Sequence, residues 1–143
     1  MIFPDANLLL YAINTDSPDH QRAFEWWKAT LESGTPVRVA SVVAFAFLRL
    51  STNRRVFARP LSVPEAFAYL ENWLSFPNAD LAESSDQDLP VVKGLLVNAG
   101  TGANLVSDAQ IAAIALRMGG EVYSADDDFQ RFSGIKWHNP LED

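Results

Sequence analysis

Four aspartates stand where a short apolar run gives way to the next expected element: Asp5, Asp108, Asp126 and Asp128. In a chain of alternating strands and helices, the carboxyl ends of parallel strands share one edge of the sheet, so we expect these side chains to converge there. Clustered carboxylates repel one another and raise each other's pKa. A divalent cation offsets that repulsion, and hard oxygen ligands suit Mg²⁺ or Mn²⁺. The residues therefore predict a metal-dependent site for phosphate chemistry.

Each of these acids also has a purely structural explanation. Asp5 could cap the N-terminus of a helix, a position at which Asp is favoured. Asp108 could stabilise the first turn of its helix through the macrodipole. The run Asp126-Asp127-Asp128 could be a polar loop. The metal hypothesis depends on the coincidence that the expected topology brings all of these positions to one edge.

Other catalytic chemistries lack the residues that they need. The chain has no Cys, and its two His residues, His20 and His138, do not form a pair with metal-ligand spacing, so a zinc site is not expected. The sequence contains no G-x-S-x-G nucleophile elbow and no G-x-x-x-x-G-K-[ST] phosphate loop.

The composition is that of a globular protein. With 143 residues, of which 48% are hydrophobic and 20% charged, one domain spanning residues 1–143 is predicted. No apolar run approaches the ~20 residues of a membrane span. The N-terminal residues lack the basic segment of a secretory signal, so we expect a cytoplasmic protein with no membrane partner.

Charge is distributed unevenly along the chain. The formal net charge of −7 argues against a broad non-specific nucleic-acid binder. No acid lies between Glu32 and Glu65, however, and five of the eleven Lys and Arg residues are in that stretch: Arg38, Arg49, Arg54, Arg55 and Arg59. This pattern predicts a local basic patch, and solvated helix-end and loop charges are the alternative interpretation.

The expected elements alternate between strand and helix. Strands are predicted over residues 2–4, 37–40, 78–83, 121–124 and 135–137, and helices over 6–13, 17–33, 41–52, 62–74, 85–100 and 107–118. Ser17-Pro18, and the capping boxes that begin at Ser62 and Ser107, mark three of the helix starts. We expect Phe67, with the apolar residues at helical spacing after it, in the core. The pattern predicts an α/β fold with a parallel sheet covered on both faces.

Two motifs resemble the PIN-domain nucleases, and within them the VapC-type toxins of prokaryotic toxin–antitoxin modules. The first is Phe3-Pro-Asp-Ala-Asn-Leu-Leu-Leu-Tyr-Ala12, and the second runs from Ser107-Asp108 through Gly120 to Tyr123-Ser-Ala-Asp-Asp-Asp-Phe129. The segment from Phe47 to Leu61 resembles one branch of these toxins. The resemblance covers essentially the whole chain. It implies a three-layer α/β/α fold with a short, mostly parallel five-stranded sheet.

The resemblance also implies roles for individual residues in a Mg²⁺-dependent endoribonuclease toxin. Asp5 and Asp108 would hold the metal, with Asp126 as a third carboxylate and Asp128 orienting water or a second ion. Asn7 and Ser124 would fix the carboxylate rotamers. Four arginines would contact RNA phosphates: Arg49, Arg54, Arg55 and Arg59.

Partners follow from the same resemblance. We expect an RNA substrate, an antitoxin whose basic tail reaches the acidic site, and a homodimer. Besides the arginine cluster, four aromatic residues could serve the protein contacts: Trp26, Trp27, Phe45 and Phe47.

One departure from the family pattern leaves a second hypothesis open. Family members typically carry a Glu on the helix after the second strand, where this chain has Ala46. A PIN-like module of weakened catalysis, which acts by binding antitoxin or RNA, is therefore the alternative. A phosphotransfer enzyme of the haloacid-dehalogenase type fits less well, because the position two after Asp5 is Asn7 rather than Asp. A phosphoreceiver domain also fits less well, because the third expected strand ends at Glu83.

Overall fold

The computed structural model describes residues 1–142, so Asp143, the last residue of the predicted domain, lies outside the described part. Five strands form one sheet in the order β3-β2-β1-β4-β5, and every neighbouring pair is parallel. The strands are β1 (Ile2–Pro4), β2 (Val37–Ala40), β3 (Ala79–Ala82), β4 (Glu121–Tyr123) and β5 (Trp137–His138). The α/β prediction is confirmed, and the sheet is parallel throughout rather than mostly parallel.

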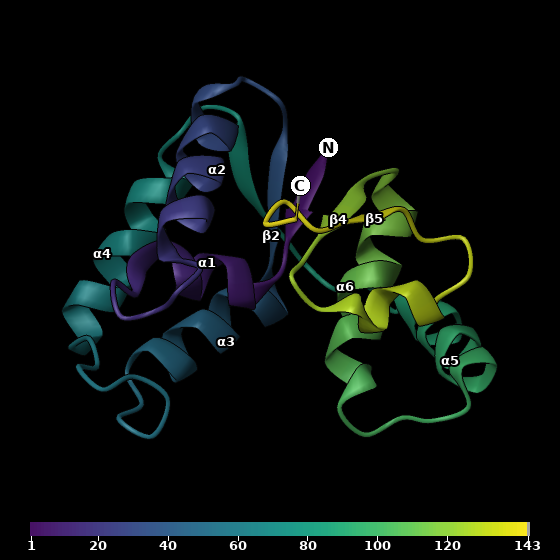
Figure 1. The fold of residues 1–143 in the computed structure, drawn as a ribbon. Coiled ribbons are helices and arrows are strands. Elements are labelled where there is room, and N and C mark those ends of the chain that lie inside the picture. The colour runs from purple at the N-terminus through teal and green to yellow at the C-terminus, as the bar shows by residue number, and fades with distance from the viewer. Residues whose placement is uncertain (143) are drawn as a thin grey trace.

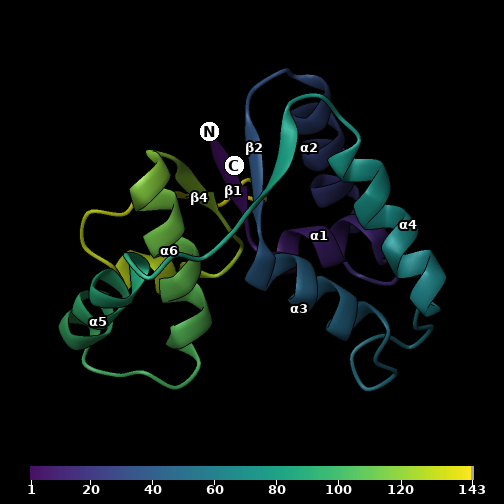
Figure 2. The same ribbon diagram turned by 180° about the vertical axis from the view of Figure 1, so that it is seen from behind.

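Helices cover both faces of this sheet. Within the described residues they are α1 (Ala6–Ile13), α2 (His20–Glu32), α3 (Ser41–Ser51), α4 (Val63–Leu74), α5 (Asp88–Ala99) and α6 (Leu105–Met118), with a 3₁₀ helix η1 (Asp127–Arg131). Figures 1 and 2 show α1 to α4 grouped to one side of the molecule and α5 and α6 to the other. None of these helices is long and apolar enough to cross a membrane.

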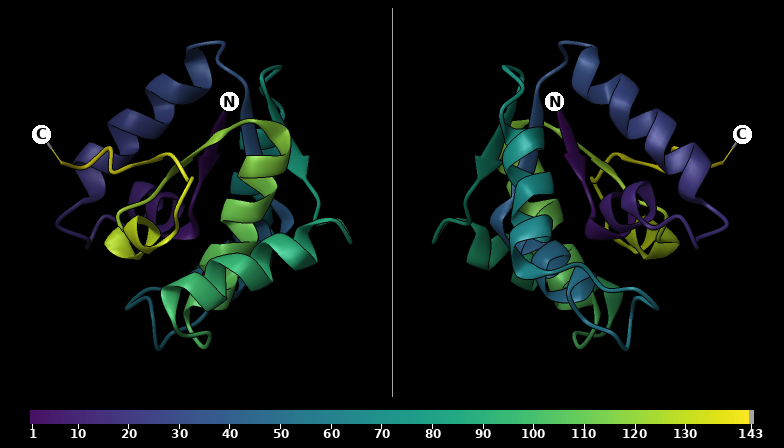
Figure 3. Two further views of the ribbon diagram at one scale, coloured as in Figure 1. Left: turned by 90° about the vertical axis from the view of Figure 1, so that its right-hand side faces the viewer. Right: turned by 90° about the vertical axis from the view of Figure 1, so that its left-hand side faces the viewer.

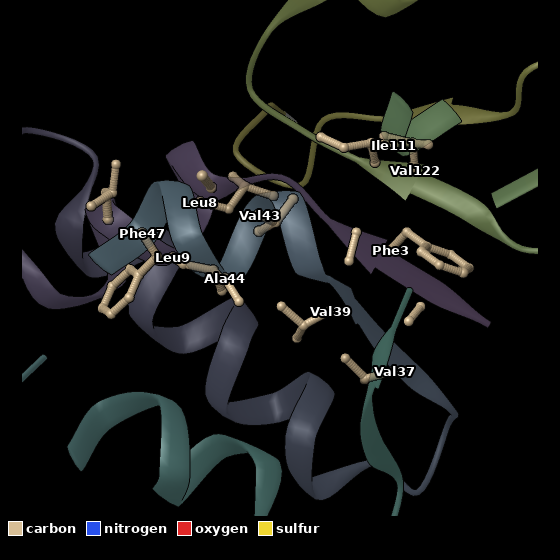
Figure 4. Close-up of a cluster of buried hydrophobic side chains, with 14 of the residues drawn as sticks. Phe3, Leu8, Leu9, Val37, Val39, Val43, Ala44, Phe47, Ile111 and Val122 are labelled. Atoms are coloured by element: carbon tan, nitrogen blue, oxygen red, sulfur yellow. The ribbon is translucent and has the colours of Figure 1, made fainter. Parts of the chain in front are cut away.

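Successive residues of β4 show the two faces. The ring of Tyr123 stacks on Trp26 of α2, with 5.6 Å between the ring centroids. The preceding Val122 is fully buried and lies beside Ile111 of α6 (Figure 4). Because neighbouring side chains of a strand point to opposite faces, α2 and α6 cover opposite sides of the sheet. The side views in Figure 3 show the same separation.

The central strand β1 is short, apolar and enclosed. Its Phe3 is fully buried and pairs in register with Val122 of β4, while Ile2 pairs with Val37 of β2. A parallel strand with neighbours on both edges and helices on both faces has to be apolar on both sides. This explains why Met1-Ile-Phe-Pro4 does not alternate between apolar and polar residues.

Two consecutive glycines connect α6 to β4 for different reasons. Gly119 caps the helix in the left-handed conformation, with φ of 73°. Gly120 has no such backbone requirement, but a Cβ atom there would lie 2.4 Å from the ring of Phe3. The close approach of the α6–β4 turn to the first strand therefore needs a residue without a side chain.

Helix starts were predicted with mixed success. Ser62 and Glu65 form the capping box at the start of α4, as predicted. The second helix starts at His20, so the prediction of Pro18 as its first residue is wrong. The Ser17 hydroxyl instead accepts a hydrogen bond from the Asp19 N–H, a local turn that competes with the helix.

The predicted capping box at Ser107 is also wrong. Helix α6 begins two residues earlier, at Leu105, because the Leu105 N–H already bonds to the Gly102 carbonyl. Asp108 remains in the first turn of the helix. Ser107 lies inside the helix with its side chain exposed.

Smaller deviations concern the core and the end of the chain. Phe67 is 44% exposed, so its placement in the core is wrong, whereas Leu70 and Trp73 are buried. The last strand comprises Trp137 and His138 rather than residues 135–137.

An ion pair of 2.7 Å between Arg117 and the nearly buried Asp88 fixes α5 against α6.

The close approach at Gly120 generates a stability prediction. Gly120→Ala should lower the free energy of unfolding by about 1–3 kcal/mol, because the new methyl group overlaps the enclosed Phe3 ring. Gly94→Ala is the matched control: it lies within α5, has open space at its Cβ position, and should gain about 0.5–1 kcal/mol from better helix propensity. Urea denaturation of both variants measures the two signs. Equal effects would contradict the packing explanation.

Candidate metal centre

The four predicted aspartates meet at the carboxyl edge of the sheet. Asp5 follows β1 and caps α1, and its backbone N–H bonds to the Tyr123 carbonyl of β4 at 2.8 Å. Asp126 follows β4 and caps η1, whose first turn contains Asp128. Asp108 comes from the first turn of α6. Both explanations of Asp5 therefore hold, since it caps a helix and also faces the other acids.

Three of these carboxylates form a compact group. One oxygen from each of Asp108, Asp126 and Asp128 lies within 4.8 Å of the others. Two oxygens on opposite sides of one Mg²⁺ are separated by about 4.1 Å, from Mg–O distances of about 2.0–2.1 Å. The group therefore has nearly the size needed to share one ion. The three residues are half-buried, so the group remains open to solvent.

The Ser124 hydroxyl organises the neighbouring carboxylates. It donates a 2.7 Å hydrogen bond to Asp5 Oδ2, and it accepts hydrogen bonds from Asn7 Nδ2 at 3.1 Å and from the Asp126 N–H at 3.0 Å. Ser124 is fully buried, so these contacts are shielded from water. Asp126 Oδ1 in turn accepts from the Asp128 N–H at 2.9 Å. Of the two residues expected to orient the carboxylates, Ser124 bonds directly to Asp5, whereas Asn7 bonds to the Ser124 hydroxyl and not to a carboxylate.

Residues that sequence reasoning missed hold Ser124 itself in place. The indole N–H of Trp137 donates to the Ser124 carbonyl at 3.0 Å, and the Ser124 N–H donates to the His138 carbonyl at 3.0 Å. No motif marks either residue in the sequence. Their role follows only from the pairing of β5 with β4.

The electrostatics of the metal-free cluster are unfavourable. Burial raises the pKa of Asp108 from 3.8 to about 7, and the charges of Asp5, Asp126 and Asp128 add to that rise. Burial also raises the pKa of Asp5, with a further increase from Asp126. The hydrogen bonds from Ser124 and the Ala6 N–H act in the opposite direction on Asp5. A divalent metal held among these carboxylates would offset the repulsion between their like charges.

The compact group differs in one member from the predicted metal-binding set. We predicted Asp5, Asp108 and Asp126 as ligands, whereas the oxygens that lie within 4.8 Å belong to Asp108, Asp126 and Asp128. Asp5 stands beside this group, close enough to raise the pKa of Asp108, and both of its oxygens already accept hydrogen bonds.

The expected departure at Ala46 lies next to this cluster. Ala46 of α3 and Asp5 line the same cavity, so the helix position without an acid does face the acidic edge. Arg49, one turn further along α3, lines this cavity too. The other three arginines proposed to contact RNA, Arg54, Arg55 and Arg59, follow α3 in the chain. Arg59 is ion-paired with Asp16 at 3.0 Å, with both side chains at least half exposed.

Comparison with known proteins identifies the family. The sequence pattern described as the PIN domain matches residues 2–135. The chain belongs to the PIN-domain family. It is 43% identical to Ribonuclease VapC33 of Mycobacterium tuberculosis over 143 residues, which is all of both chains. It is 39% identical to Ribonuclease VapC37 of the same species, over 95% of this chain and 94% of that one.

Solved structures share this PIN fold at much lower identity. The VapBC2 structure of Rickettsia felis, bound to a DNA fragment from its promoter, matches with a TM-score of 0.71 at 17% identity, over 97% of this chain and 98% of that one. VapC20 of Mycobacterium tuberculosis, described as a toxin that cleaves the sarcin–ricin loop, also gives 0.71, at 19% identity, over 95% of this chain and 99% of that one. These matches confirm the three-layer α/β/α architecture.

The raised pKa of Asp108 predicts how the stability of this PIN domain depends on pH. Between pH 3.8 and about 7 the folded state holds a proton on Asp108 that the unfolded chain has lost, so metal-free protein loses stability as the pH rises through this window. Asp108→Asn should therefore stabilise metal-free protein at pH 8 by about 1–2 kcal/mol, a value reduced for solvent screening. The gain should vanish near pH 4.

Thermal unfolding in EDTA across this pH range measures the effect. Asp127→Asn is the matched control, since Asp127 is exposed, comes from the same acidic run and is not part of the compact group. An equal gain from both variants would mean that net charge, rather than local repulsion, is responsible.

Proposed function

We propose that the protein is a metal-dependent endoribonuclease and the toxin of a toxin–antitoxin pair. The observation that carries this function is the convergence of Asp5, Asp108, Asp126 and Asp128 at the sheet edge of a PIN domain. Identity of 43% over the full length of a protein named Ribonuclease VapC33 supports the substrate class. We take residues 1–143 as one PIN domain that performs the whole reaction.

The chemistry of the cluster fits Mg²⁺, with Mn²⁺ as the alternative, because its groups are all carboxylates. Asp108 and Asp126 are the proposed ligands common to prediction and geometry, and Asp5 and Asp128 flank them. A cation held by these carboxylates would polarise the scissile phosphate and lower the pKa of the attacking water. The size of the oxygen group and the repulsion among its carboxylates support this assignment.

The remaining residues of the proposed site orient the carboxylates or attract RNA phosphates. Ser124 holds the Asp5 carboxylate in one rotamer, and Asn7 keeps the Ser124 hydroxyl pointing at Asp5 by donating to it. Asp128 is half-buried within the compact oxygen group, and its proposed role is to orient the attacking water or a second ion. Arg49 borders the Asp5 cavity, and Arg54 and Arg55 are exposed beyond it, so these three are the proposed phosphate contacts. Arg59 joins them once its exposed pair with Asp16 opens.

An antitoxin is the proposed protein partner. Solved structures of this fold include those described as VapBC2 and FitAB, each bound to a DNA fragment, and their shared fold supports the proposal. A basic tail of such a partner would neutralise the acidic cluster and compete with the cation for it. Because RNA and the antitoxin are made in the cytoplasm, we place the activity there.

Replacement of Asp5 tests the nuclease assignment. Asp5→Asn should reduce Mg²⁺-dependent RNA cleavage to background, because it removes a carboxylate beside the shared oxygen group. Ser124→Ala should lower the rate by about 10–100-fold, the usual effect of losing a group that orients a metal ligand. Gel analysis of a structured RNA with Mg²⁺, Mn²⁺ or EDTA measures both, with Asp127→Asn as a control that keeps the wild-type rate.

The alternative, a PIN module of weakened catalysis, has one supporting observation, the absence of an acid at Ala46. Wild-type protein that binds RNA but does not cleave it in either metal would favour this alternative. Cleavage that survives Asp5→Asn unchanged would instead overturn the assignment of Asp5.

We also propose a homodimer that forms through the edge of the molecule next to β3. Two of the predicted contact residues, Trp27 and Phe47, are buried in the core and are unavailable. Phe45 is 68% exposed, and with the exposed Phe67 and Leu81 it lines a cavity of about 260 Å³ between α3, α4 and β3. A second copy of the chain would remove this apolar surface from water.

Charge substitution at this apolar edge tests the dimer. Phe45→Glu should convert a dimer to a monomer at micromolar concentration, because a carboxylate cannot be buried in an apolar contact without a partner. Phe24→Glu alters an exposed aromatic side chain on α2 and should leave the mass unchanged. Sedimentation velocity distinguishes the two. A wild-type monomer at these concentrations would rule out the dimer.

A further inference from the structure

An open cavity of about 260 Å³ lies directly beside the acidic cluster, between α1, α3 and α6. Asp5 and Asn7 form its end at the sheet edge. The wall is mainly aliphatic, from Leu10 on α1, from Val42, Val43, Ala46 and Leu50 on α3, and from Ile111 on α6. A cavity of this kind is more apolar than a site for a phosphate group requires.

The missing acid creates part of this space. Ala46 is half-exposed and contributes only a methyl group to the wall, at the position where a longer carboxylate was expected. Apart from Asp5 and the exposed Arg49 at the rim, the residues that line this space are uncharged. An uncharged planar group fits there better than an anion, which the neighbouring Asp5 carboxylate would repel.

Hydrogen-bond donors at the rim are free. Among residues 1–142, neither the Arg49 guanidinium nor the Ser107 hydroxyl has a hydrogen-bond partner, and both side chains are exposed at the cavity. Asn7 and Asp5, by contrast, are already engaged with Ser124, so they can do little for an incoming group. The guanidinium offers a rigid fork of N–H donors, and the serine hydroxyl can both donate and accept.

We propose that this cavity, the Ala46 cavity, binds one unstacked base of the RNA next to the bond that is cut, and that Arg49 reads its edge. The proposal rests on the ribonuclease function proposed above. An enzyme that acts on RNA gains sequence preference when a base leaves the stack and enters a fitted pocket. Guanine is the preferred base, because its O6 and N7 acceptors match the guanidinium fork.

Filling the cavity tests the proposal. Wild-type protein with Mg²⁺ cuts a pool of random single-stranded RNA, and sequencing of the product ends gives the base preference on either side of the cut. Wild type should prefer guanine at one neighbouring position. Ala46→Phe places a ring in the cavity and should reduce that preference roughly tenfold or more. Ala46→Ser leaves the space open and should keep it.

Arg49→Lys separates base reading from charge. Lysine keeps the attraction for phosphates but lacks the planar fork, so the guanine preference should fall by a larger factor than the overall affinity for RNA. Val42→Phe is a second way to fill the space from the same helix, and it replaces Ala46→Phe if that variant unfolds. A base preference that survives both filled variants would overturn the proposal and leave the nuclease function standing.

A measurement without metal keeps the two proposals distinct. In EDTA, a short oligouridylate that carries one 8-vinylguanine, a fluorescent base that keeps the O6 and N7 acceptors of guanine, should become brighter on wild-type protein, because the base unstacks into a cavity with no aromatic lining residue. Ala46→Phe should abolish the increase. Protein that cuts no RNA but gives this signal would overturn the nuclease function alone, and the absence of the signal in wild type would overturn the cavity proposal.

Discussion

The hydrogen bond from the Ser124 hydroxyl to the Asp5 carboxylate joins two segments that are 119 residues apart in the chain. It fixes the end of β1 against the end of β4, and it restricts the rotation of the Asp5 carboxylate by holding one of its oxygens. The same hydroxyl accepts from Asn7 and from the Asp126 backbone, so three of the residues around the acidic edge share a single buried atom. Removing it would loosen the relative placement of Asp5 and Asp126 together.

That placement has an energetic cost in the absence of metal. Burial and like charges raise the pKa of Asp108 to about 7, which means that the fold holds a carboxylate where protonation is favoured. The rest of the structure has to offset this repulsion. The fully buried Phe3, Val37 and Val122 supply apolar burial directly beneath the site, and the parallel sheet joins them. A strained functional site on a well-packed scaffold is the usual arrangement.

The position of Ala46 connects this repulsion to the adjoining cavity. An additional acid there would increase the like charge near Asp5, whereas alanine leaves an apolar space bordered by Arg49. Alanine in place of the expected acid therefore lowers the repulsion within the cluster and leaves space beside it. Weakened catalysis and altered substrate contact are separate hypotheses about this one residue, and cleavage rate and base preference test them independently.

The sequence by itself was sufficient to predict the order of strands and helices along the chain. It also predicted that the four aspartates would converge at one edge of the sheet. Short apolar runs that end in Asp, with helices between them, have few alternatives to a parallel α/β sheet. Local signals were less reliable where two backbone patterns compete. At Ser17, a side-chain hydrogen bond forms a turn in place of the helix start. At Ser107, the helix has already begun two residues earlier.

Only the tertiary structure decided which acids form the compact group. Oxygens of Asp108, Asp126 and Asp128 lie within 4.8 Å of one another, whereas Asp5 lies beside this group. Strand pairing alone decided that Trp137 and His138 support Ser124. The physical reason is the distance along the chain over which each kind of interaction acts. Periodicity and capping act over a few residues, while distances among carboxylates depend on the packing of α6 and η1 against the sheet, which no local pattern specifies.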